Sequence, residues 1–368
     1  MKEFRPRLDA ELFQYVEQLR NMEEGQRKAM FNGEAQPIEI VALEREIRKE
    51  KAQLRDTKRK YEALLKAYDK LEEAHEASLY IQEPVRFNPI ELRTTGTMRQ
   101  ATAVVQYSDW HVGEVVTKGN SGGLNEFNPE IARKRAVMCF QNTLRLVRKE
   151  RQNIQIDDLV IHLGGDFIGG WIHPELMQTN SMSPIEEAHY ATELLYNGLR
   201  FLVDYGKFKR IVILCSRGNH GRNSIKMQHA NEAATNYETF IYSSLQRMLP
   251  EIEFVVPESE IGYFNIYDFT FRFYHGQQVR FGGGVGGLTI PLNKKQAGWD
   301  KVVKAHYNLM GHFHTYSMPN NQTSLNGSLK GFDAYAVSIG VGFEKPLQAF
   351  QLVDATHGIT VREPIFCQ

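Results

Sequence analysis

The stretch ATAVVQYSDWH, residues 101–111, joins an apolar run to two side chains that can bind a metal. Its first seven residues are rich in Ala and Val and predict a buried β-strand. Asp109 and His111 follow at once, two residues apart. In an extended backbone this spacing sends both side chains to the same side, so we expect Asp109 and His111 to point together into one site.

The same arrangement recurs four more times along the chain. Apolar runs at 159–163, 211–215 and 308–310, and a strand before His275, each end in Asp, Asn or His residues. In an open α/β sheet the loops beyond the carboxyl ends of the strands converge on one crevice. We therefore expect one metal site built from the side chains that follow these strands. They are Asp109, His111, Asp166, Asn219, His220, His275, His312 and His314.

The alternation of apolar runs with amphipathic stretches predicts an α/β layered domain with a largely buried central sheet. Strands at about 261–274 and 333–353 alternate less regularly with helices, so we expect a second, more antiparallel sheet. The predicted buried strands are 101–107, 159–163, 211–215, 254–256 and 308–310, and the predicted helices lie near 129–150, 184–205 and 231–248.

The ligand types indicate which metals the site would hold. Carboxylate, imidazole and amide oxygen together suit borderline divalent metals such as Mn, Fe or Zn rather than Ca. Each motif alone is weak, since an Asp-x-His arises by chance and a Gly-Asp after a strand is usually a turn. Their joint order, each at the end of an apolar strand, is specific.

Taken together, Asp109-x-His111, Gly165-Asp166, Gly218-Asn219-His220, His275 and Gly311-His312-x-His314 resemble the signature of calcineurin-like metallophosphoesterases, over about 210 residues. The resemblance implies a four-layer α/β/β/α metallophosphoesterase sandwich with two divalent metal ions. Mn is the metal we expect first, and Fe, Zn or Mg are the alternatives. It also implies the role of each residue. Asp109, His111 and His314 would hold the first metal, Asn219, His275 and His312 the second, Asp166 would bridge them, and His220 would lie near the leaving group.

A centre of this kind would hydrolyse phosphoesters. Two cations roughly 3.5–4 Å apart clamp a phosphate and lower the pKa of a shared water, so that hydroxide attacks in line at neutral pH. His220, as an imidazolium, would protonate the leaving oxygen or stabilise the charge on the phosphate.

The chain departs from the family pattern at two points. Gly221 stands where an acidic residue usually orients the catalytic His, so His220 must be oriented in another way. The Asp-Arg of protein serine/threonine phosphatases is replaced by Phe167-Ile168, which argues against a protein phosphatase. Arg222 either contacts a phosphate, to which its fork is suited, or pairs with a surface carboxylate.

The substrate rests on a softer resemblance, to SbcD-type repair nucleases and to phosphoesterases of tailed bacteriophages. Gly169 stands where the SbcD type usually carries a His, which weakens that particular assignment. A DNA nuclease is the leading interpretation, and a phosphodiesterase or phosphatase acting on nucleotides or other small molecules is the alternative. A non-catalytic scaffold, as in the retromer complex, is a third interpretation. Such a scaffold would be expected to have lost metal ligands, whereas this chain has all of them.

Three residues near the motifs are candidates for substrate binding: Arg222, His173 and Arg280. The glycine-rich run 282–287 either brings backbone amides to a phosphate chain or is simply a connection. Trp110 and Trp171 either stack on bases or pack beneath the site, and packing is favoured for Trp110 because it stands between two ligands.

The first ninety or so residues differ in composition and hydrophobic pattern from the rest. We expect a helical appendage and the start of a linker over 1–92, and the phosphoesterase domain over 93–368. Residues 38–79 contain neither Gly nor Pro and carry a heptad pattern that predicts a coiled coil, after a shorter helix at about 9–22. The coiled coil would form a homodimer or recruit a partner protein. The alternative is a solvated helix that folds back on its own domain.

Charge and cysteine content narrow the class of protein. Lys+Arg and Asp+Glu balance at 44 each, so any DNA would be bound by local basic patches. The three cysteines are odd in number and far apart, which argues against a disulfide scaffold. The N-terminus lacks the apolar core of a signal peptide, and no apolar run approaches the roughly 18 residues of a membrane span. We expect a cytoplasmic protein, in the host cytoplasm if phage-encoded, with no membrane partner.

Overall fold

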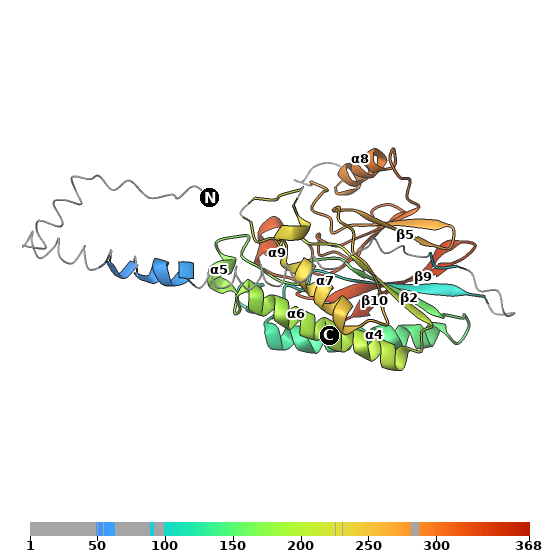
Figure 1. Cartoon of the computed structure of the whole chain (residues 1–368), viewed down its shortest axis with the longest axis horizontal. Helices are drawn as coiled ribbons and strands as arrows, with labels where there is room; N and C mark the ends of the chain where they lie inside the picture. The colour runs from blue at the N-terminus through green and yellow to red at the C-terminus, as the bar shows by residue number, and fades with distance from the viewer. Residues whose placement is uncertain are drawn as a thin grey trace, which may run out of the picture. The chain divides into compact units, whose positions relative to one another are not determined.

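Figure 1 shows the computed structural model, which describes residues 49, 51–53, 55–62, 89–91, 99–224, 226–229, 231–280 and 287–368. The chain divides into two units, 1–72 and 73–368, and each is described by itself. In the first unit the described residues are helical and exposed, and Lys60 pairs with Asp56 at 2.9 Å. Most of the predicted coiled coil at 38–79, and the helix at 9–22, lie outside the described residues. Self-association and the boundary at 92/93 therefore stay predictions.

The larger sheet of the second unit has six strands in the order β10-β9-β1-β2-β3-β4. The four strands from β1 to β4 pair in parallel, whereas β9 and β10 add antiparallel at one edge. Tyr107 lies opposite Leu163, and Leu163 opposite Cys215, so β1, β2 and β3 end at the same level. The strands are β1 (Ala101–Tyr107), β2 (Asp158–Leu163), β3 (Arg210–Cys215), β4 (Glu253–Val255), β9 (Leu347–Asp354) and β10 (Gly358–Phe366).

The smaller sheet has four strands in the order β5-β6-β7-β8. Only β5 and β6 pair antiparallel, while β6 with β7 and β7 with β8 are parallel. The expected second sheet exists, but the prediction that it is mainly antiparallel is wrong, because helix α8 (Thr289–Trp299) crosses over between β6 and β7. The strands are β5 (Gly262–Ile266), β6 (Phe269–Phe273), β7 (Tyr307–Met310) and β8 (Thr323–Leu325).

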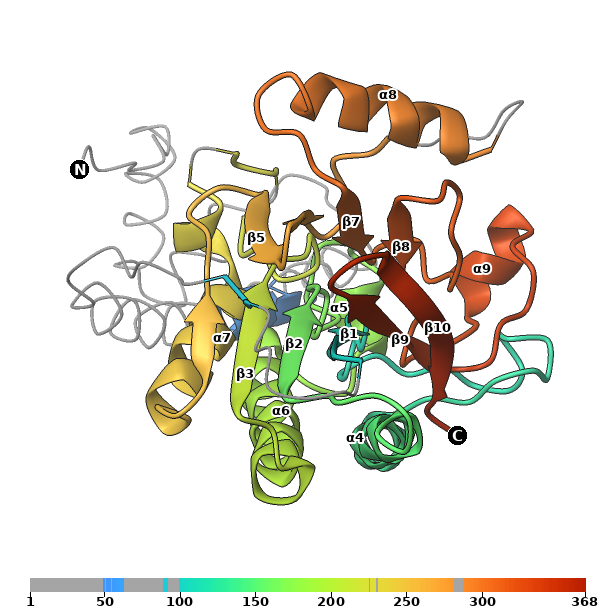
Figure 2. The same cartoon turned by 90° about the vertical axis from the view of Figure 1, so that its right-hand side faces the viewer.

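Helices close the two outer faces, as Figure 2 shows, with α4, α6 and α7 against the larger sheet and α8 beyond the smaller one. Helix α4 begins with Pro129 behind the cap Asn128, and α6 begins with a capping box between Ser183 and Glu186. Among the described residues no helix is both long enough and apolar enough to cross a membrane. The longer helices are α4 (Pro129–Glu150), α6 (Pro184–Gly206), α7 (Tyr237–Met248) and α8 (Thr289–Trp299), and the short ones are α5 (Leu176–Thr179) and α9 (Ala334–Ile339).

Three apolar cores separate the four layers, and the alternation within each strand decides which core a side chain enters. Val105 and its neighbours Ile161 and Ile213 face the helices. Val104 on the opposite face of β1 packs with Phe271 of the smaller sheet. A third, smaller core lies between that sheet and α8. The four-layer α/β/β/α architecture is therefore confirmed.

Two predicted elements, 333–353 and 231–248, need correction. Residues 334–339 are not strand but the short helix α9, because Asp333 accepts a hydrogen bond from the Ala336 amide and caps it. The strand predicted over 333–353 is β9 alone, and it joins the larger sheet rather than the smaller one. The helix predicted from 231 begins at Tyr237, because Asn236 caps it there.

The core between the sheets yields a stability prediction. Phe271 is fully buried, so Phe271→Ala should lower the free energy of unfolding by about 3–5 kcal/mol through lost burial and a residual cavity. Urea denaturation measures this change. Tyr335, 70% exposed, is the control, and Tyr335→Ala should stay within about 0.5 kcal/mol of wild type. Equal losses in the two variants would contradict the assigned core.

Candidate metal centre

The predicted ligands meet at one edge of the second unit because both sheets end there. The Asp109 amide donates to the Gly165 carbonyl at 2.9 Å, which joins the loops after β1 and β2. The Gly311 amide donates to the His275 carbonyl at 2.8 Å, which joins the loops after β7 and β6. The His312 amide then reaches across to the Asp109 carboxylate, 3.0 Å from Oδ1, and so connects the two sheets.

The backbone at the ligands is left-handed, not extended as the spacing of two led us to expect. Both the Trp110 and the His111 amides donate to the Asp166 carbonyl, at 2.8 and 3.1 Å, and a chain that turns this tightly cannot be extended. A left-handed conformation costs a non-glycine residue roughly 1–2 kcal/mol, and such residues cluster at functional sites. Positive φ angles occur at Asp109 (58°), His111 (48°), Asp166 (54°), His312 (71°) and His314 (50°).

One ligand group consists of Asp109, His111 and His314, the three residues that the resemblance assigns to the first metal. The Nε2 atoms of His111 and His314 face each other at 3.2 Å, and His314 Nε2 lies 3.4 Å from Asp109 Oδ1. Asp109 and His111 are buried, whereas His314 is partly exposed. Three converging donor atoms at these separations can enclose one cation.

A second group consists of Asp166, His275 and His312. His275 Nε2 lies 2.9 Å from Asp166 Oδ2 and 3.2 Å from His312 Nδ1. His275 Nδ1 donates to the Gly164 carbonyl at 2.7 Å, which aims Nε2 at the other two residues. The buried Oδ1 of Asn219 has no hydrogen-bond partner among the described residues, as expected of an oxygen reserved for a cation.

The residues therefore fit two divalent cations. The donors are carboxylate, imidazole and amide oxygen, and Asn219 Oδ1 is a buried acceptor that no other residue in the described part of the chain contacts by a hydrogen bond. Burial lowers the pKa of His111 to about 4 and that of His312 to about 3, so both rings are neutral at pH 7, as metal ligands must be. The bridging role of Asp166 stays a prediction. Its Oδ1 accepts the His220 amide at 2.8 Å.

The glycines of the motifs leave room for the carboxylates. A Cβ at Gly218 would overlap the Asp166 carboxylate, and a Cβ at Gly311 would overlap that of Asp109. Both positions therefore need glycine because backbone and ligand approach so closely.

His220 is oriented by a backbone group rather than by the missing acid. Its Nδ1 lies 2.7 Å from the Gly169 carbonyl, which can only accept, so Nδ1 carries the proton. The ring is 4.5 Å from that of His111 and perpendicular to it. Gly221 cannot carry a side chain, because a Cβ there would overlap the Asn236 side chain that caps α7.

The predicted substrate residues are distributed unevenly. Arg222 is half-buried and donates to the Asn219 carbonyl at 3.2 Å and the Ser224 carbonyl at 3.3 Å, so it stands beside a candidate ligand. His173 is exposed, with its ring 6.2 Å from that of His220. Arg280 is exposed, and no described contact joins it to the ligands.

Two tryptophans beside the ligands differ in exposure. Trp110 is fully buried against Phe167, with ring centroids 5.2 Å apart, so it packs beneath the site as favoured from the sequence. Trp171 is 37% exposed. Residues 282–286 of the glycine-rich run lie outside the described residues.

Sequence reasoning missed two buried carboxylates. Glu114 Oε1 lies 2.9 Å from His111 Nδ1, and its Oε2 pairs with Lys330 at 2.8 Å. Burial would raise the pKa of Glu114, but Lys330 and His111 outweigh it and hold that pKa well below its usual range. The spacing Asp-x-His-x-x-Glu was the available signal, but Glu114 stands beyond the residues that end the strand.

Glu238, in the first turn of α7, is the other. Its carboxylate accepts hydrogen bonds from the Phe167 amide at 2.8 Å and the Gly218 amide at 2.5 Å. It thereby ties together the loops that carry Asp166 and Asn219. Burial, with the Asp166 charge nearby, raises the pKa of Glu238 to about 8. No local pattern marks this residue, because its partners lie 71 and 20 residues away.

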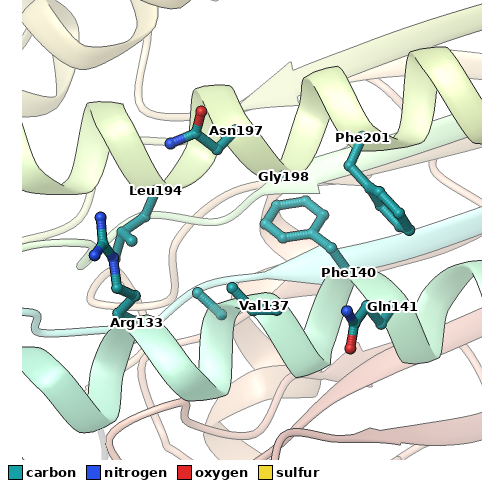
Figure 3. Close-up of a pocket in the computed structure, with 9 residues that line it drawn as sticks. Arg133, Val137, Phe140, Gln141, Leu194, Asn197, Gly198 and Phe201 are labelled. Carbon is teal, nitrogen blue, oxygen red and sulfur yellow. The ribbon is translucent and has the colours of Figure 1, made fainter.

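A separate apolar groove of about 230 Å³ lies between α4 and α6, away from every predicted ligand. Figure 3 shows the Phe140 ring beside Gly198 between the two helices, where a Cβ at Gly198 would overlap the ring. The residues that line the groove include no acidic or imidazole side chain.

No family model matches the chain, and no curated protein matches it significantly. It is similar to the hypothetical protein PH1004 of Pyrococcus horikoshii, with 12% identity over 72% of this chain and 87% of that one, TM-score 0.34. It is also similar to purple acid phosphatase PPD1 of yellow lupin, with 12% identity over 58% of this chain and 30% of that one, TM-score 0.25. A third similar structure is the SoxB sulfate thiohydrolase of Thermus thermophilus, with 8% identity over 77% of this chain and 58% of that one, TM-score 0.33. At such scores the assignment of the centre rests on the chain's own layers and ligands.

The protonation of His275 predicts proton release on metal binding. Burial alone would lower its pKa, but the adjacent Asp166 carboxylate raises it to about 10, so the metal-free protein holds a His275 imidazolium at pH 7. A metal must displace that proton, and its apparent affinity should therefore rise with pH up to about 10. Calorimetric Mn²⁺ titrations at pH 7 in buffers of different ionisation enthalpy should show about one proton released per protein. A buffer-independent enthalpy would contradict this.

Proposed function

We propose that this chain is a dinuclear metal-dependent phosphoesterase that hydrolyses phosphodiester bonds. The observation that carries the proposal is the pair of ligand groups at one edge, Asp109 with His111 and His314, and Asp166 with His275 and His312. The two groups touch, since the His312 amide donates to Asp109. Two bound cations would neutralise the phosphate charge and lower the pKa of the attacking water.

His220 supplies the proton chemistry that the chain itself contributes. Its Nδ1 is held by the Gly169 carbonyl, so Nε2 is the nitrogen through which the ring can exchange a proton. As an imidazolium, His220 would donate that proton to the leaving oxygen. The Arg222 guanidinium, placed beside Asn219, can offer its remaining N–H groups to phosphate oxygens.

DNA is the proposed substrate. Trp171 and His173 are both exposed on the segment that follows Asp166, and the His173 ring lies 6.2 Å from that of His220. Base stacking on an exposed aromatic ring contributes about 1–3 kcal/mol per base and tolerates any sequence. A nucleotide phosphodiesterase or phosphatase is the second candidate, because one exposed ring is enough for one base. A purely structural role is not favoured, since every predicted ligand is present.

Variants of the centre should separate metal binding from proton transfer. Asp166→Ala and His312→Ala should abolish turnover and metal occupancy together, because each removes a ligand. His220→Ala should keep both metals and lower kcat by about 10²–10⁴, the usual contribution of a general acid. Metal content by elemental analysis and turnover at saturating Mn²⁺ measure the two effects. A fully active, metal-bound Asp166→Ala protein would rule out the assignment.

A panel of substrates tests the reaction class. With Mn²⁺, we expect turnover of bis-p-nitrophenyl phosphate and of single- or double-stranded DNA, measured side by side with p-nitrophenyl phosphate. Trp171→Ala should weaken DNA turnover while sparing the small diester, because only DNA offers bases to stack. Activity on the monoester alone would overturn the nuclease proposal and favour a phosphatase.

A further inference from the structure

Glu114 occupies the position of a carboxylate that supports a metal ligand. It is buried three residues after His111, and its Oε1 lies 2.9 Å from His111 Nδ1. The contact has the distance of an ion pair but not the alignment of a hydrogen bond. The other ring nitrogen, Nε2, faces His314 within the first ligand group. Metal-binding histidines usually contact a carboxylate or carbonyl through the nitrogen that faces away from the metal.

Lys330 holds the Glu114 carboxylate in place. Its Nζ lies 2.8 Å from Glu114 Oε2 and 2.7 Å from the Asp333 carboxylate, and Lys330 is itself buried. Glu114 is buried as well. The ion pair with Lys330 therefore holds the Glu114 carboxylate against His111.

The same carboxylate stands near His220, which lacks its usual acidic neighbour. Glu114 Oε1 lies 4.0 Å from His220 Nδ1. Its Cγ also packs against Gly169, where any Cβ would overlap it, so Glu114 lies beside the carbonyl that holds His220. An acid at position 221 is excluded, because Asn236 fills that space.

We propose that Glu114 is a positioning residue that takes over, from the first ligand loop, the task of the acidic residue missing after His220. It orients His111 as a metal ligand and places a negative charge beside His220. This role rests on the proposed function and adds to it Glu114, whose carboxylate converges with His111 and His220 rather than with Asp109 and His314.

The test replaces the carboxylate by an amide of the same shape. In the full chain, Glu114→Gln should weaken Mn²⁺ binding about 10–100-fold, as loss of such a supporting carboxylate does. At saturating Mn²⁺ it should lower kcat by a similar factor and leave KM nearly unchanged, because Glu114 does not face the substrate. Calorimetric titration of the metal-free protein and turnover of bis-p-nitrophenyl phosphate give the two readouts.

Asp354→Asn is the matched control. Asp354 is also buried and paired with a cation, Arg99, but it lies opposite Ala101, at the end of β1 away from the centre. This variant should bind Mn²⁺ and turn over as wild type does, although its metal-free unfolding temperature falls. A merely structural loss at Glu114 would make the two variants alike.

A failure of the role proposed for Glu114 can be told apart from a failure of the proposed phosphoesterase function. If Glu114→Gln does not fold, Glu114→Asp keeps the charge for Lys330 but withdraws it from His111, and the same loss of Mn²⁺ affinity is expected. Wild-type affinity and kcat in whichever variant folds would overturn the role of Glu114. If the wild type binds Mn²⁺ but cleaves no phosphoester, the proposed function fails, and the titrations alone still decide the positioning role.

Discussion

Two buried carboxylates, Asp109 and Asp166, impose the constraint on which the rest of the domain depends. Both are enclosed almost completely, and an ionised carboxylate in that position is costly unless it is paired and hydrogen-bonded. Asp109 receives the amide of His312, and Asp166 receives the amide of His220 and the ring of His275. These partners come from loops of both sheets, so satisfying the two charges joins the sheets at one edge.

The layers around that edge are shaped by the same requirement. The motif glycines leave space for the carboxylates, and the start of α7 supports the loops from the side. Asn236 caps the helix and donates to the Gly218 carbonyl, while Glu238 accepts the amides of Phe167 and Gly218. The helical layer is therefore connected to the metal centre by hydrogen bonds and not only by the apolar core.

Much of the fold and of the site could be predicted from local patterns. The strand over 101–107 and the helix over 129–150 were predicted with their observed bounds. The candidate ligands were identified because each follows an apolar run. Local patterns did not predict the edge pairing of β9 and β10, the crossover helix α8 or the cap of α9. The pairing and the crossover depend on which distant strand lies alongside, and the helix α9 depends on one capping side chain. The left-handed turns at Asp109 and His312 were missed for the same reason, because hydrogen bonds from other loops impose them.

By itself, the sequence determined which residues could bind metal and at which strand ends they stand, because apolar runs and the polar residues after them are local properties. Only the tertiary structure decided what surrounds His220. The carbonyl that holds His220 lies 51 residues away, at Gly169, and the carboxylate of Glu114 comes from the loop after β1. Asn236 fills the space beside Gly221, so an acid could be supplied only from another loop, and that exclusion exists only once the helix and the three strand ends pack together.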